Sequence, residues 1–289
     1  MKLWPILLMF LPVFSQNPPE SAVFLFDVHW EQRDFSLSNG RNISQHKGYN
    51  NQPSFYDNNQ LLYARNRDGQ TDIALYDIAK DSTSYLSKTP HGSEFSPTRI
   101  PGSPDVAAVR LDEDGAQQLF TYAMNGDSTR LLSASKVGYF DFYKPDKILA
   151  AVVNPSGMDL HFIDGKTPQD SLIITNVGRG VRKVPDSDFM SYALVNESGG
   201  LDIYLLDVAE EMASYFICTL PIGIQDYTWL NSAEILIGSR NQLFIYDTLG
   251  EAKWVQATTL KTDGLQQITR IAVSPSGTKI AVVAQVPKS

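Results

Sequence analysis

The chain has 289 residues, with 24 lysines and arginines against 32 aspartates and glutamates, so its net charge is −8. Because phosphate binding needs clustered lysine and arginine, an acidic chain without a basic block is a poor candidate for binding nucleic acid or an anionic membrane. A hydrophobic share of 43% with 19% charged residues is typical of an ordered globular protein. The single cysteine, Cys218, excludes an intrachain disulfide and a cysteine-rich zinc site.

The first residues have the layout of a secretory signal peptide. Lys2 supplies a positive charge, and residues 3–14 form an apolar run shorter than the about 20 residues that a membrane-spanning helix needs. We expect a signal peptide over residues 1–15, a single domain over residues 16–289, and a protein that is periplasmic or secreted and not embedded in a membrane. A buried N-terminal strand or an uncleaved anchor is the alternative.

A strand-like pattern of alternating aliphatic and aromatic residues recurs six times, and five of the six copies end in aspartate. The copies are residues 22–27, 72–77, 118–123, 159–164, 202–207 and 242–247, which start 40 to 50 residues apart. Runs of small and aliphatic residues form a second series of predicted strands at 61–64, 106–109, 148–151, 189–192, 235–238 and 280–283. Glycine turns such as Asp68-Gly69 join most runs to the next copy.

This unit predicts four antiparallel strands in about 40–45 residues, the period of a propeller blade. The chain begins with the last two strands of a unit, 22–28 and 35–44, and ends after the second strand of another, near Gln285. The sequence therefore predicts an all-β, six-bladed propeller of four-stranded antiparallel blades, whose last blade is closed by the N-terminal strands. The recurring aspartates are then turn residues rather than a catalytic or metal site.

Residues 48–55, with Leu61-Leu62-Tyr63 and then 68–73, resemble the TolB-like six-bladed propeller repeat of exported bacterial proteins. The segment 274–280 is similar to that family's Ser-Pro-Asp-Gly-Lys turn, with Ser276 in place of the aspartate. The resemblance covers residues 22–285 and is weaker in the third to fifth blades. It implies a protein-binding or scaffold role in the cell envelope, or a propeller attached to an enzyme, and it names no ligand.

Motifs of catalysis are missing from the chain. There is no Gly-x-Ser-x-Gly turn, phosphate-binding loop or His-Glu-x-x-His pair, and the four histidines fall in different repeats without metal-ligand spacing. We expect no metal and no cofactor. The alternative is that two histidines from different blades, His46 and His91, face one ligand. Cys218 is expected to be a small buried hydrophobe.

The loops of all blades meet at the central channel of a propeller, so polar residues at the starts of the inner strands are the candidate ligand-binding set. They are Asn51, Gln52, Glu94, Tyr139, Asp141, Arg179, Arg182, Asp226 and Arg270. Such a ring could hold a peptide end or a small polar ligand by hydrogen bonds, or could bind only water.

These observations together favour a non-catalytic exported propeller that acts as a protein- or peptide-binding or scaffold module in the cell envelope. Its partner is an unidentified protein or peptide, and the sequence sets no oligomeric state. One alternative is a binder of a small polar ligand or glycan, including a lyase or hydrolase that uses the channel. Another is a structural subunit of an envelope assembly, which a contiguous apolar patch on one face would favour.

Overall fold

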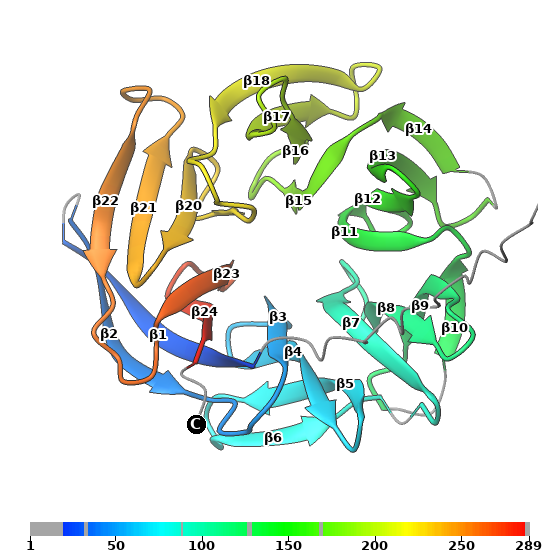
Figure 1. Ribbon diagram of the computed structural model, residues 1–289, viewed down its shortest axis with the longest axis horizontal. Helices are drawn as coiled ribbons and strands as arrows, with labels where there is room; N and C mark the ends of the chain where they lie inside the picture. Colours follow the sequence, from blue (N-terminus) through cyan, green and yellow to red (C-terminus); the bar gives the residue numbers. More distant parts are fainter. Residues whose placement is uncertain (1–19, 32–33, 88, 126–128, 168–169, 287–289) are drawn as a thin grey trace, which may run out of the picture.

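Six four-stranded antiparallel sheets stand around a common axis in the computed structural model, which describes residues 20–31, 34–87, 89–125, 129–167 and 170–286 (Figure 1). Each sheet is one blade, and its inner strand faces the central axis while its fourth strand lies at the rim. The propeller predicted from the repeats is therefore confirmed. The predicted signal peptide, residues 1–15, lies outside the described residues.

The strands of each blade are given from the inner to the outer one. Blade 1 holds β3 (Asn50–Phe55), β4 (Gln60–Arg67), β5 (Gln70–Asp77) and β6 (Ser82–Tyr85). Blade 2 holds β7 (Gly92–Arg99), β8 (Val106–Asp112), β9 (Gln117–Tyr122) and β10 (Thr129–Ser133). Blade 3 holds β11 (Val137–Lys144), β12 (Lys147–Asn154), β13 (Gly157–Asp164) and β14 (Asp170–Ile174).

The other three blades follow the same order. Blade 4 holds β15 (Val177–Lys183), β16 (Phe189–Val195), β17 (Leu201–Asp207) and β18 (Ala213–Thr219). Blade 5 holds β19 (Thr228–Trp229), β20 (Glu234–Ser239), β21 (Gln242–Asp247) and β22 (Trp254–Thr259). Blade 6 holds β23 (Gln267–Val273), β24 (Lys279–Gln285), β1 (Ser21–Glu31) and β2 (Asp34–Asn42), so the two ends of the chain share one sheet, as predicted.

The apolar core lies between neighbouring blades. Val23 and Leu25 of β1 pack with Leu61 and Tyr63 of β4, which joins blade 6 to blade 1. A similar cluster joins blades 2 and 3, where the small side chain of Ala107 is fully buried. Small residues in the second strands let adjacent sheets approach closely, which explains the alanine and glycine at these positions.

Four of the recurring aspartates end their strand by accepting hydrogen bonds from the next turn. Asp77 Oδ1 accepts from the N–H groups of residues 79 and 80, and Asp207 Oδ1 accepts from those of residues 209 and 210. Asp164 and Asp247 make the same kind of contact two residues ahead. The fifth, Asp27, instead binds Asn39 and Lys279. Their predicted role in turns is confirmed for the first four.

Cys218 is buried on β18, and burial raises the pKa of its thiol to about 12. It is the small buried hydrophobe that the sequence predicts. Within the part of the chain that the structure describes, no helix is long and apolar enough to cross a membrane.

Candidate functional site

A polar channel runs between the inner strands of the blades. Its wide chamber, of about 510 Å³, and its narrow chamber, of about 220 Å³, share the lining residues Gln52, Tyr139, Asp226, Arg270 and Ile271. The two chambers are therefore parts of one channel. The volume of the wide chamber is in the range of pockets that take small ligands or a few residues of a peptide.

Eight of the nine residues predicted to form the channel mouth line this channel. Asn51 and Arg179 line the wide chamber, and Asp141 and Arg182 line the narrow one. Gln52, Tyr139, Asp226 and Arg270 line both. The structure thus brings together residues from four blades and from the segment that leads into the fifth, at positions up to 219 apart in the numbering, from Asn51 to Arg270.

Glu94 is the ninth residue, and its prediction was wrong, because it does not line either chamber. Its side chain is fully buried, and its Oε1 accepts a hydrogen bond from the Tyr122 hydroxyl at 3.1 Å. Burial raises the pKa of the Glu94 carboxyl. Ser96, two residues further along β7, lines the narrow chamber instead. Here the pairing of β7 with β8 is irregular. The repeat located the inner strand but not which side of it each side chain faces.

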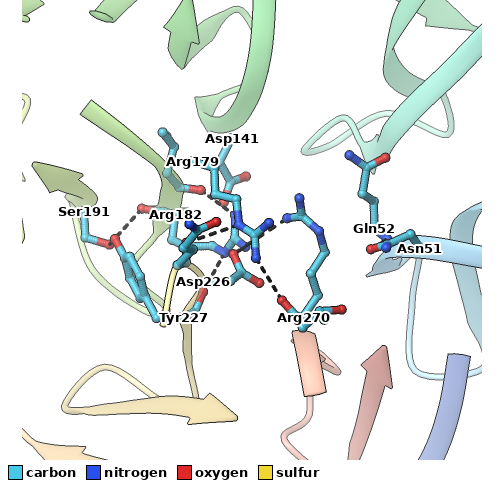
Figure 2. A network of polar contacts seen from close by, with 12 residues as sticks. Asn51, Gln52, Asp141, Arg179, Arg182, Ser191, Asp226, Tyr227 and Arg270 are labelled. Carbon is cyan, nitrogen blue, oxygen red and sulfur yellow. Dashed lines mark hydrogen bonds and ion pairs between the residues drawn. The ribbon is translucent and has the colours of Figure 1, made fainter. Parts of the chain in front are cut away.

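Arg182 positions Asp226 within the channel. Arg182 Nη2 donates to Asp226 Oδ1 at 2.8 Å, and its Nε donates to the carbonyl oxygen of Tyr227 at 3.1 Å. The segment around Asp226 is also held to blade 4, because the Tyr227 hydroxyl and the Trp229 indole both donate to Ser191 Oγ. Figure 2 shows Asp226 among the three channel arginines. Arg182 uses its donors within the protein and acts as a positioning residue.

Arg179 and Arg270 lack such a carboxylate partner at hydrogen-bond distance. Arg179 donates only to main-chain oxygens, those of Gln225 at 3.2 Å and Thr269 at 3.0 Å. Arg270 Nη1 lies 3.7 Å from Asp226 Oδ1, and its guanidinium lies 5.2 Å from the centre of the Tyr139 ring. Burial and the charge of Arg270 lower the pKa of Arg179. The two arginines therefore place positive charge in the channel that the protein balances incompletely.

The amide side chains of Asn51 and Gln52 on β3 line the same channel. Asn51 Oδ1 accepts from the N–H of Gln52 at 2.8 Å, and Gln52 Oε1 accepts from the N–H of Ser96 at 2.9 Å. Each oxygen thus already accepts one hydrogen bond from the main chain, and the –NH₂ groups are donors that a ligand can use. Asp141 is likewise occupied, since its two oxygens accept from the N–H groups of Phe142 and Lys183 at 2.8 Å each. Burial raises the pKa of Asp141.

The sequence analysis missed several residues that line the wide chamber. Tyr49 contributes a phenol whose pKa is raised to about 12 by burial, so it keeps its proton at neutral pH. Gln267 and Thr269 of β23 also line the chamber. The segment 220–227 before the short strand β19 crosses one side of the chamber, and Ile222 in it is fully exposed. Tyr49 lies inside the quoted repeat motif, which was the available signal.

No family model matches the chain, and no curated protein does. Among solved structures, a putative TolB from Agrobacterium tumefaciens superposes with a TM-score of 0.70 at 15% identity, covering 94% of this chain and all of that one. The chain has the TolB-like fold. TolB from Acinetobacter baumannii gives a TM-score of 0.60 at 7% identity, covering 92% of this chain and only 65% of the longer TolB chain.

The TolB-like fold is also similar to that of an enzyme. An oligogalacturonate lyase in complex with manganese superposes with a TM-score of 0.59 at 9% identity, covering 94% of this chain and 99% of the lyase. Identities this low show a common fold only.

The histidines of this TolB-like chain do not meet in the channel. Among the described residues, no group of three or more histidine, cysteine, aspartate or glutamate side chains is placed to hold a metal ion. His46 and His91 are exposed, and His91 Nδ1 lies 3.3 Å from Glu113 Oε1 on the surface. His161 lies on β13, with its Nδ1 3.5 Å from Asp170 Oδ2. Neither chamber is lined by a histidine.

Proposed function

We propose that this protein is a non-catalytic, exported binding module of the cell envelope that holds a segment of a protein or peptide in the wide chamber. The observation that carries the proposal is the lining of that chamber, where hydrogen-bond donors from several blades face one solvent-reaching cavity. Gly223 and Gln225 line the chamber and are exposed, so a ligand has access from that side. The TolB-like fold supports the same reading by analogy.

The second candidate is a binder of an acidic glycan, or a lyase acting on one. It is favoured by the similarity of the fold to oligogalacturonate lyase and by the channel arginines, which suit carboxylated sugars. The assay is the release of unsaturated products from polygalacturonate by the purified protein. We expect no turnover above that of the buffer. Turnover that disappears in the Arg270→Gln variant would replace our proposal with this candidate.

The binding proposal is tested by photo-crosslinking in cells that express the full chain. A photoreactive amino acid replaces Gln225, which lines the chamber and uses its main-chain oxygen to hold Arg179. The matched control carries the same amino acid at Leu172, which is 55% exposed on the rim strand β14.

We expect a discrete crosslinked protein from position 225 and none of that size from position 172. Equal crosslinking from both positions, or none from position 225, contradicts binding at the chamber.

A further inference from the structure

We propose that Arg179 and Arg270 form a carboxylate-binding pair, and that the segment held in the wide chamber carries an acidic side chain or its C-terminal carboxylate at this pair. The inference rests on the proposed function, because it names the chemistry of the segment held at the same site. It assigns the specificity of the chamber to two arginines, while Arg182 serves to position Asp226.

The hydrogen bonds that the channel residues already make within the protein give the first argument. Each acceptor oxygen that Asn51, Gln52 and Asp141 bring to the channel already receives an N–H from the main chain. Asp226 Oδ1 accepts from Arg182, and Asp226 Oδ2 is buried without a hydrogen-bond partner among the described residues, out of reach of a ligand. The charged groups that the channel offers a ligand are therefore donors, the guanidinium groups of Arg179 and Arg270, and the amide –NH₂ groups of β3 add neutral donors. A carboxylate accepts from several donors at once and makes charge-assisted bonds to guanidinium groups.

The charge balance of the channel gives the second argument. Three arginines and two aspartates are the charged residues that line the two chambers, so the lining is net positive within a chain of net charge −8. Burial alone lowers the pKa of Arg270, but the charge of Asp226 raises it overall. For Arg179, burial and the charge of Arg270 outweigh the opposing effect of Asp226, so its pKa stays lowered, and one anionic group placed beside both arginines would neutralise the excess.

The surroundings of the pair favour a peptide over a sugar. A sugar ring commonly stacks on an open aromatic face, but the Arg270 guanidinium already lies over the Tyr139 ring. Ile224 lines the chamber on the side of the pair, and Ile222 next to it is fully exposed. Apolar side chains beside a cationic pair suit a peptide that carries an acidic group next to an apolar residue.

The test is selection of a phage-displayed random heptapeptide library on the full-length protein, followed by affinity measurements on synthetic copies of the selected peptides. The variants are Arg179→Gln and Arg270→Gln, with Arg130→Gln as the matched control, since Arg130 is exposed on the rim strand β10 and the change in charge is the same. Arg179→Lys keeps the charge and replaces Arg179→Gln if that variant melts much lower. A trimer of galacturonate is the competing sugar probe.

We expect the selected peptides to share an aspartate, a glutamate or a required free C-terminus. Their affinity should fall by about tenfold or more in Arg179→Gln and Arg270→Gln and stay unchanged in Arg130→Gln. Higher salt should weaken binding to the wild type.

Selected peptides without a common acidic group, equal affinity for all variants, or tight binding of the galacturonate trimer without any selected peptide would each overturn the inference. Failure of the inference is distinguishable from failure of the proposed function. If position 225 crosslinks a protein while the selected peptides are neutral, the chamber binds peptide but the arginine pair does not select a carboxylate.

Discussion

Val23 in β1 pairs with Val283 in β24, so the beginning and the end of the propeller lie side by side in one sheet. The pairing continues in antiparallel register from Ser21 with Gln285 to Asp27 with Lys279, where the two side chains also form an ion pair. The central residues of this seam, Val23 to Leu25 on β1 and Ile280 to Ala284 on β24, are fully buried. Blade 6 therefore holds the ring closed, and the channel residues on β23 depend on it.

Removing residues 20–44 should abolish the cooperative unfolding transition of the protein, rather than leave the rest of the propeller folded. The deletion takes away β1 and β2 and leaves the apolar residues of β24, among them Val282 and Val283, exposed along an open strand edge. Circular dichroism and thermal melting measure the result.

A circular permutant provides the control. It starts at residue 45 and joins residue 286 to residue 20 by a turn of about two to five residues, which is possible because Ser21 and Gln285 are paired. We expect the permutant to melt cooperatively. A deletion variant that melts as cooperatively as the parent would contradict the closure.

Gly238→Ala should destabilise the protein by about 1–3 kcal/mol, the usual effect of overpacking a close contact. Gly238 on β20 packs against blade 6, and an added Cβ would clash with the side chain of Ile268. Chemical denaturation measures the free energy of unfolding. Gly200→Ala is the control, because its Cβ would meet the Asn196 amide at 3.2 Å, a much milder contact, and should cost less. Equal effects for the two variants would count against close packing between blades 5 and 6.

Glu94→Gln should remove a pH dependence of stability. Because burial raises the folded-state pKa of Glu94 above its ordinary value of 4.5, the folded protein holds this proton more tightly than the unfolded chain. Its contribution to stability is complete below that value and is lost as the pH rises through the folded-state pKa. At neutral pH the variant should be more stable than the wild type by about 1–3 kcal/mol, since the charged form leaves Oε2 buried without a partner.

The measurement is chemical denaturation of both proteins from about pH 4 to about pH 8. The difference in free energy of unfolding should grow in favour of the variant as the pH rises and then level off. A difference that is constant, or that grows in favour of the wild type, would show that the folded-state pKa of Glu94 is not raised.

The sequence predicted the fold well because a propeller repeats one local pattern. Alternating residues such as those of 72–77, the glycine turn at Gly69 and the aspartate that ends five of the six copies are local signals, and their spacing sets the number of blades. The split sixth blade followed from counting strands at the two ends. The exception was blade 5, where β19 has two residues and the segment 220–227 crosses the chamber in place of a longer inner strand.

The site was harder to predict, because a repeat gives the position along a strand and not the direction of each side chain. Glu94 illustrates this, since it is regularly paired and buried, whereas the irregular pairing that follows, between Phe95 and Thr98, leaves Ser96 on the channel. The difference between Arg182, which holds Asp226, and Arg179, which binds only main-chain oxygens, depends on contacts between blades. No pattern within one strand contains that information.

The most direct test of the account is a double-mutant cycle between Arg270 and the acidic group of the tightest selected peptide. Isothermal titration calorimetry gives the affinity of the acidic peptide and of its uncharged counterpart, with aspartate or glutamate changed to the amide, for the wild type and for Arg270→Gln. The account predicts that the change in the peptide weakens binding to the wild type by about tenfold or more but barely affects binding to the variant. An equal loss of affinity for both proteins would contradict it.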